Sequence, residues 1–144
     1  MGIAPVSVDV SALAAILDEQ RVRVVELPGK GRGVVAARFF ARGERIEQAP
    51  VIIIEEPHVA AVETSILDNY VYNWDRERIA VALGCGSLYN HSYQPNAVYL
   101  KNFASGVIDY VALCDIQPGQ EILINYNGDP SCQTRVWFDV IEPT

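Results

Sequence analysis

The sequence is poor in cysteine, and the few that it has are far apart. Cys85, Cys114 and Cys132 are the three cysteines, and no two of them form a CxxC pair. This spacing excludes the usual ligand pattern of a structural zinc site and gives no disulfide framework. We therefore expect no metal site and a reducing compartment. The cytoplasm is the expected location, with the nucleus and export without a signal peptide left open.

The sequence also has no long hydrophobic run. No apolar stretch approaches the ~20 residues that a helix needs to cross a bilayer. The first five residues, MGIAP, lack the basic region and the long apolar region of a secretory signal. We expect no membrane partner and no export through the secretory signal pathway.

Positive charge is scarce as well. The 11 Lys and Arg residues face 18 Asp and Glu residues, which gives a formal net charge of -7. An acidic protein is repelled by phosphate backbones, so nucleic acid is an unexpected direct partner. An acidic surface suits a basic protein or peptide, although solubility alone explains it equally well.

The 144 residues that are present, half of them hydrophobic, fit one domain with a hydrophobic core. Alternating or β-branched runs bounded by turn residues predict short strands. These cover residues 21–27, 34–38, 46–54 (interrupted at Pro50), 70–74, 79–83, 96–103, 107–113 and 121–125. The fold class is therefore mainly β.

Little helix is expected beside these strands. Residues 8–20 have an apolar face at helical spacing, and a second short helix is expected near residues 63–67. The helix over 8–20 either packs on its own domain or serves as a dimerisation element.

A polar segment with apolar flanks, GSLYNHSYQPN, occupies residues 86–96. Taken alone, it predicts an Asx-turn made rigid by Pro95. Each of its buried polar groups would cost about 1–3 kcal/mol without a partner. These groups must therefore be satisfied within the protein or by a ligand.

Two further motifs accompany this segment. Residues 29–36 read GKGRGVVA, and residues 115–126 read DIQPGQEILINY. We expect Gly31 and Gly33 in a loop, where glycine permits close approach of the backbone to a ligand. β-Branched residues follow these glycines instead of a helix, which excludes a Rossmann dinucleotide site.

In this order the three motifs resemble the SET-domain protein lysine methyltransferases, over about residues 22–128. The family pattern is GxG, then Asn-His-Ser…Pro-Asn, then Gly-x-Glu-(apolar)-x-x-x-Tyr. The resemblance implies several small curved sheets with a threaded C-terminal segment. It divides the chain into an extension at 1–20, a SET domain at 21–128 and a tail at 129–144 that closes the cofactor site.

The resemblance also implies methyl transfer from S-adenosylmethionine to the amine of a lysine in a basic protein or peptide. A homodimer is a further expectation. The alternative is a SET-fold binding module that has lost activity. A third interpretation, an unrelated β-rich domain, requires three ordered motifs to coincide by chance.

Site residues follow from the motifs. The resemblance implies cofactor binding by Lys30, Gly31, Arg32, Gly33, Asn90, His91 and Tyr126, with Trp137 stacking over the adenine. It implies catalytic roles beside the transferred methyl for Tyr126 and Tyr99. From the residues alone, His91 is equally a core histidine bonded to a neighbouring loop, and Trp137 equally a residue that docks the tail.

Two departures from the family pattern stand out. Ala49 occupies a position where many members carry a tyrosine that reaches the lysine channel, which leaves the number of transferred methyl groups open. Only Cys132 follows Tyr126, so we do not expect the cysteine-rich zinc module of many members.

Overall fold

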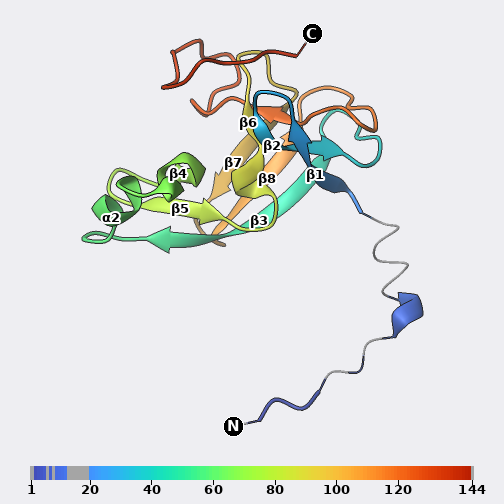
Figure 1. Cartoon of the computed structure of the whole chain (residues 1–144), viewed down its shortest axis with the longest axis horizontal. Helices are drawn as coiled ribbons and strands as arrows, with labels where there is room; N and C mark the ends of the chain where they lie inside the picture. Colours follow the sequence, from blue (N-terminus) through green and yellow to red (C-terminus); the bar gives the residue numbers. More distant parts are fainter. Residues whose placement is uncertain (1, 6, 8, 13–19, 144) are drawn as a thin grey trace.

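The chain forms three small β-sheets with little helix, as the computed structural model shows for residues 2–5, 7, 9–12 and 20–143 (Figure 1). The prediction of a mainly β fold of short curved sheets is confirmed. Of the predicted helix at 8–20, residues 10–12 are helical and exposed, while residue 8 and residues 13–19 lie outside the described part.

A two-stranded antiparallel hairpin opens the domain. It joins β1 (Val22–Leu27) to β2 (Gly31–Ala36), with Val22 opposite Ala36 and Leu27 opposite Gly31. The expected loop at Gly31 and Gly33 was wrong, because both glycines lie within β2 and pair with β1. The turn therefore ends at Lys30, and β2 carries the GxG motif.

A five-stranded antiparallel sheet forms the centre. Its order is β4 (Val71–Asn73), β5 (Ile79–Ala82), β3 (Arg45–Ile54), β8 (Val107–Ala112) and β7 (Ala97–Asn102). The predicted interruption at Pro50 was wrong, since β3 runs through it for ten residues. Its first half pairs with β8 and its second half with β5, so Pro50 lies where the partner changes.

The segment between β3 and β4 contains two short helices instead of the one expected near 63–67. They are α2 (Val59–Glu63) and the 3-10 helix η1 (Ile66–Tyr70). The Ser65 side chain, which accepts a hydrogen bond from the Leu67 amide, caps η1 and separates the two. No helix among the described residues is long and apolar enough to cross a membrane.

The third sheet brings two sequence motifs together. The 3-10 helix η2 (Gly86–Leu88) leads into β6 (Asn90–His91), which pairs in parallel with β9 (Leu123–Ile124). The segment around β9 is held from the other side as well, because the Ile122 amide donates to the Val34 carbonyl at 2.8 Å. Residues 122–125 are therefore buried between β2 and β6.

The core lies between the central sheet and these motif strands. Its largest fully buried side chains are Trp74, Tyr89, Tyr110, Phe40, Ile46, Ile108, Ile116, Ile122 and Ile124. Gly86 lies against this core, because a Cβ placed there would be 2.6 Å from Ala82 Cβ and 2.8 Å from Tyr110 Oη. Both distances are shorter than van der Waals contact, so η2 can approach the sheet only without a side chain.

Replacing this glycine should destabilise the fold. Gly86→Ala is expected to lower the free energy of unfolding by about 1–3 kcal/mol, because the added methyl overpacks the core. Urea denaturation measures this loss. Ser105→Ala, at an exposed turn position, is the control and should change stability by less than about 0.5 kcal/mol. Equal stability of the two variants would contradict the close packing of η2.

Candidate active site

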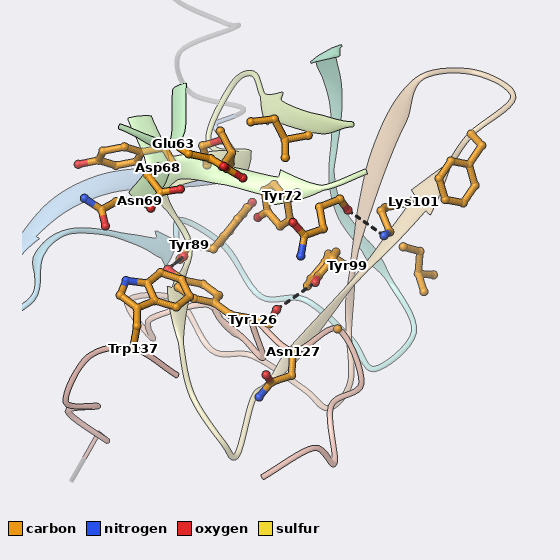
Figure 2. Close-up of a pocket in the computed structure, with 18 residues that line it drawn as sticks. Glu63, Asp68, Asn69, Tyr72, Tyr89, Tyr99, Lys101, Tyr126, Asn127 and Trp137 are labelled. Atoms are coloured by element: carbon orange, nitrogen blue, oxygen red, sulfur yellow. Dashed lines mark hydrogen bonds between the residues drawn. The ribbon is translucent and has the colours of Figure 1, made fainter. Parts of the chain in front are cut away.

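Two adjoining clefts lie on the motif side of the domain. The larger cleft has a volume of about 720 Å³ and the smaller cleft about 290 Å³. Residues common to both are Asn69, Tyr70, Ser87, Tyr126 and Trp137. These five residues therefore stand where the clefts meet. Figure 2 shows two of them, Tyr126 and Trp137, next to each other in the larger cleft.

The smaller cleft gathers most of the residues expected to bind a cofactor. Its walls include Lys30, Gly31, Arg32, Asn90, Tyr126 and Trp137. Gly33 and His91 are buried and do not line this cleft. A Cβ at Gly33 would be 2.8 Å from Asn90 Nδ2 and 3.0 Å from Glu121 Oε1. The second glycine of the GxG motif therefore makes room for the side chains that support the cleft.

Asn90 is held by a polar network. Its Nδ2 donates to the Arg32 carbonyl at 3.1 Å and to Glu121 Oε1 at 2.9 Å. The other carboxylate oxygen of Glu121 pairs with Lys30 Nζ at 2.7 Å, and both side chains are only 12–13% exposed. Both amide hydrogens of Asn90 are thus used, and no described group donates to its Oδ1. The network leaves this oxygen free to accept a hydrogen bond in the smaller cleft.

His91 is a core residue that supports Tyr126. Its side chain is 3% exposed, and its Nδ1 accepts a hydrogen bond from the Tyr126 amide at 3.0 Å. Its Nε2 is buried and has no partner among the described residues. Burial lowers the pKa of His91, and the nearby Glu142 carboxylate opposes this shift only in part. The imidazole is therefore neutral, with Nδ1 as the acceptor.

The two tyrosines expected to be catalytic, Tyr126 and Tyr99, both line the larger cleft. Tyr126 donates its hydroxyl hydrogen to the Tyr89 carbonyl at 2.6 Å, and burial raises the pKa of Tyr126 to about 12. Tyr99 lines the larger cleft and donates to the Tyr126 carbonyl at 3.3 Å. Burial raises the pKa of Tyr99 too. Both phenols stay protonated at neutral pH and can orient a ligand, but neither can serve as a base.

The tail is docked by residues other than Trp137. Val136 is buried and its amide donates to Tyr93 Oη at 3.1 Å. Glu142 accepts from Ser92 Oγ at 2.6 Å and from the Tyr93 amide at 3.0 Å. The tail is therefore fixed beside β6, where Figure 1 shows it in red.

Trp137 itself is 69% exposed, and its ring is inclined by 23° to that of Tyr126 with centroids 6.0 Å apart. Phe138 lines the smaller cleft next to it. Both rings therefore present aromatic surface to the smaller cleft, where a planar ligand group can stack.

Several wall residues were missed from the sequence. Asn69, Tyr70 and Ser87 line both clefts, and Tyr72 lines the larger one. The alternation at residues 70–74 predicted a strand but gave no sign that its tyrosines face a cleft. Glu121 was missed as a site residue although it belongs to the third motif. In the part of the chain that the structure describes, no group of three or more His, Cys, Asp or Glu side chains could hold a metal ion.

The neutral state of His91 can be tested in solution. We expect NMR titration to give His91 a pKa below its ordinary value of 6.5, because burial disfavours the imidazolium. Its contribution to stability should be complete above pH 6.5 and fall as the pH drops through the native pKa. His58→Gln removes the other histidine and assigns the resonance. A pKa above 6.5 would contradict the neutral acceptor role.

Comparison with known proteins agrees with this geometry. The SET domain family matches residues 31–127. A histone-lysine N-methyltransferase of Schizosaccharomyces pombe, specific for H3 lysine-37, is 32% identical over 111 residues, which cover 76% of this chain and 71% of that protein. A crystal structure of a candidate histone methyltransferase from Plasmodium falciparum superposes with a TM-score of 0.61 at 27% identity, over 75% of this chain and 98% of that one. The resemblance of the three motifs is thereby confirmed, and the chain belongs to the SET-domain family.

Proposed function

We propose that the protein transfers a methyl group from S-adenosylmethionine to the side-chain amine of a lysine in a protein. The observation that carries this proposal is the position of Tyr126, which lies on the walls of both clefts. S-adenosylmethionine supplies an activated methyl group on a positively charged sulfur. Direct in-line displacement requires the two reactants to meet from opposite sides, and two clefts that adjoin at one tyrosine suit this requirement.

The residues of the smaller cleft fit the proposed cofactor. The free Oδ1 of Asn90 can accept from an ammonium group, and Arg32 on the same wall can pair with a carboxylate. The rings of Trp137 and Phe138 offer a surface on which a purine can stack. These three features match the two ends of S-adenosylmethionine, an amino acid and an adenosine.

The larger cleft suits a lysine side chain. Its walls include the half-buried rings of Tyr72 and Tyr99 together with that of Tyr126. A site shielded from water disfavours the ammonium form of lysine and lowers its pKa, which favours the nucleophilic amine. The protonated hydroxyl of Tyr126 orients groups at the junction of the clefts. Catalysis is therefore by positioning, and no covalent enzyme intermediate is needed.

A basic protein is the proposed substrate. Two carboxylates, Glu63 and Asp68, and one cation, Lys101, line the larger cleft, and the whole chain carries a net charge of -7. Positively charged neighbours of the target lysine would be attracted to such a wall. The S. pombe relative is specific for H3 lysine-37, which makes histone H3 the first substrate to test. An inactive binding module is not favoured, because the motif residues of both clefts are in place.

Two further proposals come from the sequence. The protein is proposed to act in the cytoplasm and to form a homodimer through its N-terminal extension. Light scattering at working concentration tests the proposed homodimer, and a measured mass equal to that of one chain would contradict it.

Cofactor binding should depend on Asn90. Asn90→Ala should weaken binding of S-adenosylmethionine by about 1–3 kcal/mol, because it removes the free acceptor and loosens the network with Glu121. Isothermal titration calorimetry measures the affinity. Asn102→Ala is the matched control, since Asn102 is the exposed last residue of β7 and lines neither cleft. An unchanged affinity in a folded Asn90→Ala protein would refute the assignment of the smaller cleft.

The transfer step should depend on the Tyr126 hydroxyl. Removing one well-placed polar group lowers an enzymatic rate by ~10²–10³-fold, and we expect this loss in Tyr126→Phe with nearly normal cofactor affinity. Single-turnover methyl transfer with saturating cofactor measures the rate. Tyr99→Phe should have a smaller effect, because Tyr99 lines only the larger cleft. If Tyr126→Phe keeps the wild-type rate, the active site lies elsewhere.

A further inference from the structure

Positive charge is concentrated in one part of the chain, although the net charge of the whole is -7. Residues 21–45 contain seven Lys or Arg and two Glu, which gives this segment a net charge of +5. The other 119 residues contain four Lys or Arg and 16 Asp or Glu, a net charge of -12. The expectation that nucleic acid is no direct partner rested on the net charge, which averages over two unlike parts of the chain.

The basic segment and an acidic segment lie at opposite ends of the domain. β3 begins at Arg45 beside the β1–β2 hairpin and ends at Ile54, next to the segment that contains α2 (Figure 1). Ten residues of strand span about 30 Å. Residues 55–70, at the far end of β3, contain four carboxylates and no Lys or Arg, and two of these carboxylates line the larger cleft. The domain is therefore basic at one end and acidic at the other.

Two arginines of the basic end pack on the ring of the buried Phe40. The guanidinium carbons of Arg21 and Arg38 lie 5.3 Å and 4.6 Å from the centre of this ring. Arg21 also donates to the Arg45 and Ile46 carbonyls, so its side chain joins the beginning of β1 to the beginning of β3. The three arginines therefore belong to one surface, which the packing of the fold holds in place.

Two more arginines extend this surface. Arg23 lies two residues beyond Arg21, and side chains two apart lie on the same face of an extended chain. Arg42 lies in the turn before β3, where its amide donates to Asp115 Oδ1 at 2.9 Å. Both Arg23 and Arg42 are exposed, and neither guanidinium makes a hydrogen bond or an ion pair with any described residue. Their donors are therefore available to a ligand.

Carboxylates neutralise the surface only in part. Arg38 pairs with Glu44 at 2.9 Å, and Arg45 lies 3.5 Å from Asp109. With Asp115, which accepts from the backbone, three carboxylates are in contact with the five arginines in the part of the chain that the structure describes. None of the five arginines lines either cleft. A ligand bound to them therefore leaves both clefts open.

We propose that this basic surface, formed by Arg21, Arg23, Arg38, Arg42 and Arg45, binds the phosphate backbone of double-stranded DNA. All five cations are arginines, whose planar guanidinium can make two parallel hydrogen bonds to one phosphate. The choice of DNA among polyanions rests on the proposed function, because a histone, the first substrate to test, is held on DNA. The acidic end of the domain then faces the basic protein, and the basic end faces the DNA around it.

Fluorescence anisotropy with a labelled duplex of about 20 base pairs tests this binding. We expect the wild-type protein to bind at about 50 mM salt with a dissociation constant of about 10⁻⁴ M or tighter, without preference for sequence. The double variant Arg23→Gln with Arg42→Gln should bind at least about tenfold more weakly. The slope of log K against log salt concentration should also fall by about two, because two phosphate contacts are lost.

The matched control is the double variant Arg76→Gln with Arg135→Gln. It removes the same charge from two exposed arginines outside the basic surface. Salt screens a general change in net charge, so this variant should bind the duplex within about threefold of wild type. Both double variants should methylate a free H3 peptide at the wild-type rate, because none of the four arginines lines a cleft.

The outcomes separate this inference from the proposed function. Failure of the wild-type protein to bind the duplex, or equal losses in the two double variants, would overturn the DNA-binding surface while methyl transfer to the peptide stands. Displacement of the duplex by polyglutamate as effectively as by unlabelled DNA of equal charge would indicate a surface for acidic polypeptides, and would also overturn it. Absence of methyl transfer by the wild-type protein would contradict the proposed function and leave the measured DNA binding unchanged.

Discussion

The amide of Tyr126 donates to Nδ1 of the buried His91, and this bond joins two segments that are 35 residues apart. It continues the parallel pairing of β6 with β9, so the Asn-His-Ser segment and the strand that ends in Tyr126 form one unit. The bond needs a neutral imidazole, which burial provides by disfavouring the imidazolium. This contact holds the backbone of Tyr126, and the bond from the Tyr126 hydroxyl to the Tyr89 carbonyl holds its ring at the junction of the two clefts.

The same unit explains why the three motifs contain the residues that they do. Gly33 has no side chain because one would collide with Asn90 and Glu121. Glu121 in turn spans from Asn90 to Lys30 and ties the third motif to the first. A half-satisfied buried network is costly, so these residues form a set in which each one requires the others. The three motifs, which are far apart in the sequence, therefore meet in one wall of the smaller cleft.

The sequence predicted most of the strands, because alternation is a local signal, and the resemblance of its motifs implied six residues that lie on the walls of the smaller cleft. The sequence did not predict the contacts between residues that are far apart along the chain. The role of Glu121 depends on Asn90, which lies 31 residues away, and Glu142 fixes the tail through Ser92, which lies 50 residues away. Pro50 was predicted to interrupt its strand, because the sequence of this segment alone does not show that β3 changes its partner from β8 to β5 at this residue.

A crystal structure with S-adenosylhomocysteine and an H3 peptide would test the two-cleft arrangement most directly. The expected result places the cofactor in the smaller cleft, with its ammonium group on Asn90 Oδ1, its adenine beside Trp137 or Phe138, and its sulfur next to Tyr126. The peptide lysine should enter from the larger cleft between Tyr72 and Tyr99. A cofactor bound in the larger cleft, or a lysine that approaches Tyr126 from any other side, would contradict the arrangement.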